Sequence, residues 1–155
     1  MKKILLINPP WVAGYYTKAG FGFPPLGLEY LSASLKNAGH KTYIMDMNVE
    51  KFDYIHYDFS IWDMVGITAD TTRFGDACNI AKTIKQKGVP VVIGGSHASA
   101  VPESILENNS VDYVILGEGE EVIVKLVSAI KDNEKLPEIN NLASIVKLSS
   151  KNIMD

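Results

Sequence analysis

The sequence has little cysteine and no long apolar run. Cys78 is the only cysteine in 155 residues, which excludes an intrachain disulfide and a cysteine-rich metal cluster; it falls on an apolar helix face, where we expect it in the core. No apolar run approaches the roughly 20 residues of a membrane span. Residues 4–7 are shorter than the about 7–15 residues of a signal-peptide core. We therefore expect a cytoplasmic protein that begins with a buried strand over residues 3–8.

Basic runs and nucleotide-binding motifs are also missing. The net charge of −3 and the lack of a basic run argue against nucleic acid or an anionic membrane as the main partner. No Gly-x-Gly-x-x-Gly motif follows the first strand, and there is no Walker loop. Asn8-Pro9-Pro10 stands where a phosphate-accepting receiver domain would carry acidic residues. No nucleophile can be paired with a base, so we name no catalytic residue and no metal ligand.

Strands and helices alternate along the chain. Apolar runs rich in β-branched residues predict five buried strands, over residues 3–8, 41–46, 64–68, 89–94 and 112–116. Apolar residues at helical spacing predict helices that begin near Pro25, Asp70 or Thr71, residue 102 and residue 122. This alternation implies right-handed crossovers and a parallel sheet. We predict an α/β, flavodoxin-like (Rossmann-like) fold with an open parallel five-stranded sheet, order 2-1-3-4-5, and helices on both faces.

The length suits one domain with a sizeable core. We expect this domain to span residues 1–136. Residues 137–155 have the composition of a linker or the start of a following domain, and residues 142–148 within them suit a short extra strand.

Two predicted strands end abruptly at glycine. One junction is Val91-Val92-Ile93-Gly94-Gly95-Ser96-His97, and the other is Val114-Ile115-Leu116-Gly117-Glu118-Gly119-Glu120. Glycine there lets the backbone approach a ligand closely or turn through φ > 0. Ligands of open α/β sheets bind outside the carboxyl ends of the strands. We therefore expect a site formed by four loops, at residues 8–24, 68–72, 94–99 and 117–120.

Each of these loops also has an interpretation that needs no ligand. Gly94-Gly95 can be a plain turn, and a lone loop histidine such as His97 is usually solvated or bonded to backbone. Thr68 can belong to a cap before a helix, and the acidic residues of 117–120 suit the dipole of a helix's first turn. The aromatic residues of 11–23 either pack their own loop or cover a flat apolar ligand or a partner domain.

An ordered set of motifs over about residues 3–130 resembles the cobalamin-binding domains that precede radical SAM enzymes. Each motif alone is weak, and the ordered set is fairly specific. The motifs are Asn8-Pro9-Pro10, Pro24-Pro25-Leu26-Gly27-Leu28-Glu29-Tyr30-Leu31, Ala38-Gly39-His40, Gly66-Ile67-Thr68, Gly94-Gly95-Ser96-His97 with Pro102, and Gly117-Glu118-Gly119-Glu120.

The resemblance implies that cobalamin is the cofactor, with its nucleotide tail in a slot between the sheet and its loops. Thr68 would contact the dimethylbenzimidazole base, and Gly94 and Gly95 would leave room for the ring. Related cobalamin domains bind cobalt through the histidine of an Asp-x-His-x-x-Gly motif that follows their first strand. This sequence has no such motif. Base-off binding without a histidine ligand is therefore implied, with the loop 9–24 over the lower face. The implied cofactor-binding residues are Asn8, Pro9, Pro10, Thr68, Ala69, Asp70, Gly94, Gly95, Ser96, His97, Gly117, Glu118 and Gly119.

The sequence departs from the family in lacking the Cys-x-x-x-Cys-x-x-Cys motif of radical SAM catalysis. A 4Fe–4S cluster and S-adenosylmethionine are therefore expected only in a full-length protein that carries a C-terminal radical SAM domain in cis. The chain is then a fragment or a free-standing carrier, and in the whole enzyme cobalamin would transfer a methyl group or assist a radical transformation. The alternatives are a flavin or other small-ligand domain on the same fold, or an interaction module that binds no ligand.

Overall fold

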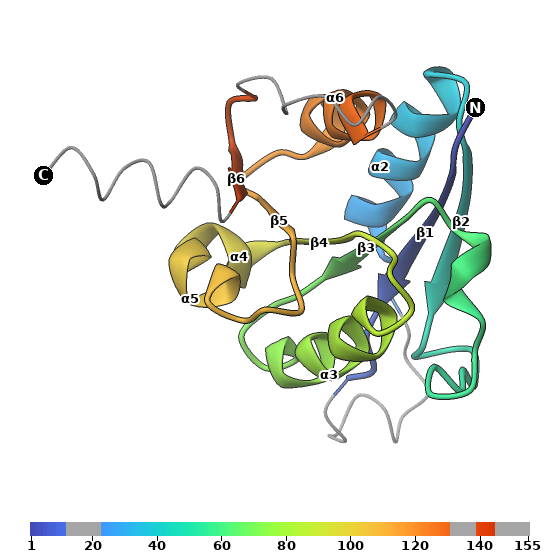
Figure 1. Ribbon diagram of the computed structural model, residues 1–155, viewed down its shortest axis with the longest axis vertical. Coiled ribbons are helices and arrows are strands. Elements are labelled where there is room, and N and C mark those ends of the chain that lie inside the picture. The colour runs from blue at the N-terminus through green and yellow to red at the C-terminus, as the bar shows by residue number, and fades with distance from the viewer. Residues whose placement is uncertain (12–22, 131–138, 145–155) are drawn as a thin grey trace, which may run out of the picture.

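The computed structural model describes residues 1–11, 23–130 and 139–144. Its centre is a six-stranded sheet in the order β2-β1-β3-β4-β5-β6 (Figure 1). The first five strands pair in parallel, and β6 pairs antiparallel with β5. The predicted fold and strand order are confirmed, and an edge strand extends the sheet beyond the predicted five. The strands are β1 (Lys3–Asn8), β2 (Lys41–Asp46), β3 (Met64–Thr68), β4 (Val91–Gly94), β5 (Tyr113–Ile115) and β6 (Leu142–Ser144).

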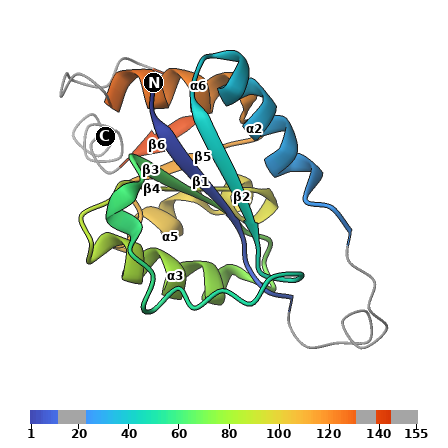
Figure 2. The same ribbon diagram turned by 90° about the vertical axis from the view of Figure 1, so that its right-hand side faces the viewer.

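Helices cover both faces of the sheet. Helices α2 (Leu26–Asn37) and α6 (Glu120–Ile130) lie side by side on one face, as both views show (Figures 1 and 2). The opposite face carries α3 (Phe74–Lys85), with the short helices α4 (Ser96–Ala100) and α5 (Pro102–Leu106) beside it. A single 3-10 turn, η1 (Phe59–Ile61), precedes β3.

The strands read as continuous apolar runs because both of their faces are buried. In β1, Ile4 and Leu6 pack in the cluster under α2 and α6, whereas Leu5 and Ile7 pack in the cluster under α3. All four side chains are at most 1% exposed. The pleat sends successive side chains to opposite faces, so each strand contributes to two cores.

Helix α2 begins one residue later than predicted. Pro25 is the N-cap residue rather than part of the first turn, and Leu26 is the first helical residue. Leu28 and Leu35 are buried, whereas Ala38 is exposed because it lies past the last helical residue. Gly39 then turns the chain with a φ of 83°, a conformation that glycine commonly adopts just after a helix.

The connection from β4 to β5 differs from the prediction. Residues 94–99 were expected to be loop, but α4 begins directly after Gly95, whose φ of 108° turns the chain sharply out of the strand. The single helix expected over about 102–108 is α5, and Pro102 is in its first turn. A five-residue helix such as α4 is too short for a hydrophobic period to reveal.

The segment between β2 and β3 contributes an aromatic cluster that the sequence pattern did not reveal. Phe59 is 0% exposed and belongs to the core under α3. Phe52 and Tyr57 pack edge-on to it, with ring centroids 6.1 Å and 4.9 Å away. This packing needs no regular spacing of apolar residues, so a hydrophobic period could not have revealed it.

Strand β6 lies inside the segment that was expected to be a linker or the start of a following domain. It coincides with the first residues of the short extra strand expected over 142–148, whose later residues lie outside the described ranges. Ile139 and Leu142 are buried in the core under α2 and α6. The boundary at residue 136 stays a prediction, as does the cytoplasmic location. In the described ranges no helix is long and apolar enough to cross a membrane.

Candidate functional site

A pocket of about 150 Å³ opens between the sheet and helices α2 and α6, toward the carboxyl ends of β3, β4 and β5. Four strands (β1, β3, β4 and β5), two helices and the loop after β5 contribute to its wall. Among the described residues, most of the lining is apolar or glycine, and the polar side chains are a threonine and two glutamates. The lining residues are Leu6, Gly27, Leu28, Leu31, Gly66, Ile67, Thr68, Val92, Gly94, Gly95, Ile115, Gly117, Glu118, Gly119, Glu120 and Ile123.

Two strand residues lack side chains on this face, and the space beside one of them, Gly66, is filled by Leu6, whose Cδ2 would be 2.9 Å from a Cβ atom there. Gly66 pairs with Val92 and Thr68 pairs with Gly94, so the two glycines lie diagonally on neighbouring strands. Val92 packs in the cluster under α2 and α6, and alternation along β4 puts Gly94 on the same face. Among the described residues, a Cβ atom at Gly94 would meet only Ile115, at 3.8 Å. The described part of the chain therefore leaves the space beside Gly94 open.

Gly95 is a glycine for a different reason. Its φ is 108°, a conformation that L side chains rarely adopt, and a Cβ atom there would lie 2.6 Å from the carbonyl oxygen of Ala69. Ala69 itself is buried, and its N–H donates to the carbonyl of Gly94 at 2.9 Å. The backbone of the β3 and β4 ends is thus packed too closely for any side chain at position 95.

The loop after β5 forms the rim of the pocket. Gly117 turns with a φ of 64°, and its N–H donates to Ser99 Oγ at 2.9 Å. Gly119 packs tightly, since a Cβ atom there would be 3.0 Å from Leu31 Cδ2. Glu118 is exposed at this rim.

Thr68 provides the polar group nearest the sheet. It is the last residue of β3 and is half-buried. Its hydroxyl makes no hydrogen bond to any side chain or backbone group in the part of the chain that the structure describes. A hydroxyl can donate and accept, so Thr68 can bond one polar atom of a ligand in the pocket.

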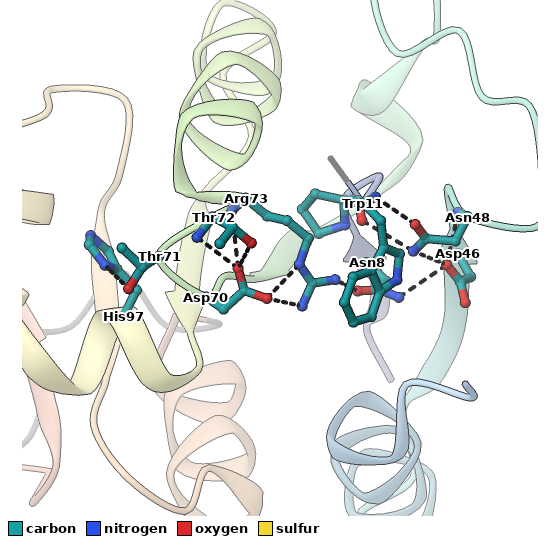
Figure 3. Close-up of polar contacts among 10 residues, drawn as sticks. Asn8, Trp11, Asp46, Asn48, Asp70, Thr71, Thr72, Arg73 and His97 are labelled. Atoms are coloured by element: carbon teal, nitrogen blue, oxygen red, sulfur yellow. Dashed lines mark hydrogen bonds and ion pairs between the residues drawn. The ribbon is translucent and has the colours of Figure 1, made fainter. Parts of the chain in front are cut away.

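A polar network lies at the carboxyl ends of β1, β2 and β3 (Figure 3). Arg73 is 9% exposed and donates from Nη1 to Asn8 Oδ1 at 2.7 Å. Its Nε and Nη2 lie 2.8 Å and 2.7 Å from Asp70 Oδ2. Partial burial by itself would raise the pKa of Asp70, but hydrogen bonds from Thr72 and Arg73, with the positive charge of Arg73, hold that pKa below its ordinary value.

The network continues to the end of β2. Asn8 Nδ2 donates to Asp46 Oδ1 at 3.0 Å, and the same oxygen accepts from Asn48 Nδ2 at 2.8 Å. The N–H of Trp11 donates to Asn48 Oδ1 at 2.6 Å, and the guanidinium carbon of Arg73 lies 4.8 Å from the centre of the Trp11 ring. Arg73 therefore joins the end of β1 to the residues after β3, and Asn8 extends the network to the end of β2 (Figure 3).

The histidines of the chain lie away from the pocket wall. His97 Nδ1 is 3.2 Å from Thr71 Oγ1 (Figure 3). The centre of the His97 ring is 4.3 Å from that of Phe74. His56 pairs with Asp53 in an exposed loop. His40 directly precedes β2 and so lies at the opposite, amino-terminal edge of the sheet. None of these three described residues lines the pocket.

The expected site residues fall into separate groups. Those that line the pocket are Thr68, Gly94, Gly95, Gly117, Glu118 and Gly119. Asn8 and Asp70 belong to the polar network, and Pro9 and Pro10 follow Asn8 in the chain. Ala69 is buried beneath Gly95, and Ser96 and His97 are in α4. The lower-face cover expected from the loop 9–24 lies mostly outside the described residues.

Sequence reasoning missed much of the pocket's inner wall and the central cation of the network. Gly66 gave a usable signal, because a glycine inside a buried strand often marks a place where a ligand or another part of the backbone comes close to the strand. Leu6, Leu28 and Ile123 gave none, since they look like ordinary core positions. Arg73 also gave none, because a single arginine before a helix is common.

The sequence matches the family model described as the B12 binding domain over residues 13–127. The chain belongs to the B12-binding domain family. The cofactor of that family is cobalamin (B12), so the expected family and cofactor are confirmed.

Relatives with this domain are much longer proteins. An uncharacterized methyltransferase from Pyrococcus horikoshii is 36% identical over 148 residues, which are 91% of this chain and 32% of that protein. The hopanoid C-3 methylase of Methylococcus capsulatus is 30% identical, over 92% of this chain and 29% of that protein. The chain thus spans about 30% of the length of these relatives.

A solved structure has the same fold. The radical S-adenosylmethionine methyltransferase TsrM from Kitasatospora setae, determined with cobalamin and a [4Fe-4S] cluster bound, superposes with a TM-score of 0.77 at 24% identity. The match covers 92% of this chain and 29% of TsrM. The similarity extends to the fold of the domain, and the residues around the pocket must be judged on their own geometry.

The pocket suits one part of a cobalamin molecule. An engineered cavity of about 150 Å³ admits a single benzene ring, whereas pockets that hold a drug-sized ligand measure about 300–1,000 Å³. A pocket of about 150 Å³ therefore fits one flat base and is too small for a corrin ring. The apolar wall and the lone Thr68 hydroxyl also match a benzimidazole, which is apolar except for its ring nitrogens.

Proposed function

We propose that this chain binds cobalamin base-off, without a histidine ligand on cobalt, as the cobalamin domain of a longer radical SAM protein. The observation that carries the proposal is the open, glycine-floored pocket within a domain of the B12-binding family. The base enters the pocket, and the corrin stays outside, across the carboxyl ends of the strands.

The size of the pocket supports base-off binding. A base that occupies a protein pocket has left the cobalt to which it would otherwise coordinate. Gly94 provides the open floor, and the Thr68 hydroxyl would donate to the free ring nitrogen of the base. Glu118 and Gly119 line the rim and would border the ribose side of the nucleotide.

The histidine-free claim is supported by the positions of the histidines. His40 lies at the amino-terminal edge of the sheet, and His56 is paired in an exposed loop. His97 is the only one at the carboxyl edge, and its ring packs on Phe74 while its Nδ1 contacts Thr71. These contacts direct it away from the pocket, toward α3.

The length of the relatives supports the longer protein. Cobalamin, when bound, supplies methyl transfer or assistance to a radical transformation, while the protein supplies binding and orientation. A radical SAM domain in cis would supply the 4Fe–4S cluster and S-adenosylmethionine. The domain described here would present the cofactor to it from the carboxyl edge of the sheet.

The first test is binding. Purified protein is incubated with hydroxocobalamin, desalted, and its absorption spectrum recorded beside a parallel sample incubated with flavin mononucleotide. Corrinoid bands that stay with the protein support the proposal. Retention of flavin and not of cobalamin would favour the flavin-binding alternative, and retention of neither would favour the interaction module.

The second test reads the coordination of cobalt. The bound complex is reduced to Co(II), and its electron paramagnetic resonance spectrum is compared with that of His97→Ala. We expect no nitrogen hyperfine coupling from an axial imidazole in either protein. Clear nitrogen coupling that disappears in His97→Ala would refute histidine-free binding, and coupling that persists would show that the base itself remains on cobalt.

A further inference from the structure

Among the described residues, no side chain at the inner end of the pocket offers a hydrogen bond. The wall there includes Leu6, Gly66 and Val92, which lie in register on β1, β3 and β4. The backbone groups of Gly66 and Val92 belong to the paired strands β3 and β4, so the ladder already uses them. The Thr68 hydroxyl is the only side-chain polar group among the described strand residues that line this pocket.

The remaining polar side chains are at the rim. Glu118 is in the loop after β5, and Glu120 is the first residue of α6. Both are carboxylates, which accept hydrogen bonds and are best stabilised in contact with water. They can meet the ribose side of an entering nucleotide, but the inner end of the pocket lies on the far side of Thr68 along β3.

The orientation of the base follows from its attachment. The base is joined through ribose and phosphate to a corrin that the pocket cannot admit. Its ribose-bearing five-membered ring must therefore face the rim, and its six-membered ring must enter first. In dimethylbenzimidazole the leading edge carries two methyl groups. In adenine the leading ring carries nitrogen acceptors and an amine.

We infer that the pocket selects among corrinoids by the polarity of the lower base, accepting a benzimidazole and rejecting a purine; this rests on the proposed cobalamin function. One hydroxyl satisfies the one free ring nitrogen of a benzimidazole. An adenine base would bury further donors and acceptors against Leu6 and Val92, where no described side chain could pair with them. Unpaired polar groups give stronger discrimination than a small difference in apolar bulk.

The test measures dissociation constants for three probes with this chain. They are cobalamin, the cobamide that carries adenine as its lower base, and cobinamide, which has no base. Each value is corrected for the fraction of free corrinoid that is already base-off, measured from its absorption spectrum. We expect the adenine cobamide to bind at least tenfold more weakly than cobalamin, which is about 1.4 kcal/mol.

A pocket variant provides a control that does not depend on absolute stability. Val92→Thr has nearly the same shape and adds a hydroxyl at the inner end, so the ratio of the two dissociation constants should shrink severalfold. The ratio is measured on the same folded protein and is insensitive to a uniform loss of affinity. Circular dichroism checks that Val92→Thr folds. If it does not fold, Thr68→Val is used instead. The affinity of Thr68→Val for cobalamin should fall toward the affinity for cobinamide.

The outcomes separate the inference from the proposed function. Equal affinities for the two complete cobamides, with cobinamide weaker, would overturn the selectivity and leave cobalamin binding intact. Equal affinity for cobalamin and cobinamide would overturn both the selectivity and the placement of the base in the pocket. Failure to bind any of the three would overturn the proposed function itself.

Discussion

Removing the Arg73 guanidinium should cost more stability than removing an exposed lysine of the same formal charge. Arg73→Met keeps the length of the side chain and deletes its donors. Asn8 Oδ1 and Asp70 Oδ2 then lose partners at 2.7 Å, and Trp11 loses the cation beside its ring. The side chain of Arg73 is 11% exposed, so water cannot easily replace the lost bonds.

The magnitude follows from the burial of the two partners. Removing one member of a fully buried ion pair costs about 3–5 kcal/mol, because a charge is left without a partner. Asp70 is 32% exposed at its side chain and can regain some hydration, so we expect a loss of about 2–3 kcal/mol. Lys125→Met is the matched control, since its pair with Glu121 has side chains 62% and 88% exposed. That variant should lose at most about 0.5 kcal/mol.

Urea unfolding followed by circular dichroism at pH 7 measures both variants. The pH dependence provides a second check through Asp70→Asn. The pKa of Asp70 is lowered in the folded protein from an ordinary value of 3.8, so its ionic contribution is present above pH 3.8 and is lost as pH falls through the folded value. The stability gap between wild type and Asp70→Asn should therefore close below pH 3.8. A loss for Arg73→Met no larger than that for Lys125→Met would refute the reasoning.

The remaining predictions concern the pocket and the missing cluster. Gly94→Val should weaken cobalamin binding at least tenfold, about 1.4 kcal/mol, with little change in Tm, because its Cβ meets only Ile115 and its methyl groups enter the pocket; unchanged affinity in a titration would remove Gly94 from the site. Gly95→Ala should instead lower the free energy of unfolding by about 1–3 kcal/mol through backbone strain and the close carbonyl of Ala69, and a urea curve that overlays wild type would contradict this. The chain alone should neither hold a 4Fe–4S cluster nor cleave S-adenosylmethionine, because Cys78 is its one cysteine and burial raises the pKa of that thiol. Anaerobic reconstitution, iron counting and a 5′-deoxyadenosine assay check this, and stoichiometric cluster with product would show it to be wrong.

The strand pattern predicted the sheet because burial on both faces leaves a direct signature. In β1 the run Ile4-Leu5-Leu6-Ile7 is apolar at every position, which a half-exposed strand would not be. The alternation with helices then restricted the strand order, since crossovers are right-handed. β6 follows no such rule: three residues that pair antiparallel at an edge leave only a short, ambiguous pattern.

The pocket was only partly predictable because it depends on contacts between distant segments. The glycines at strand ends drew attention to the correct edge of the sheet. They did not distinguish Gly94, which leaves open space, from Gly95, whose backbone conformation and contact with Ala69 require glycine. That distinction depends on φ and on a neighbouring strand, neither of which a single sequence displays. The inner wall likewise joins residues as far apart as Leu6 and Ile123.

The pocket and the polar network together explain how the carboxyl edge can be both open and ordered. A hollow in a protein interior loses packing contacts, so its walls need support from elsewhere. The pocket floor belongs to strands buried on both faces, and the Arg73 network ties the ends of β1 and β3 beside it. Thr68 and Gly94 are paired across β3 and β4, and the N–H of Ala69 donates to the Gly94 carbonyl at 2.9 Å, so backbone bonds join these two strand ends directly. Because preformed walls spare a ligand the entropy of ordering them, the affinity for a base should depend on its fit and polarity more than on the flexibility of the domain.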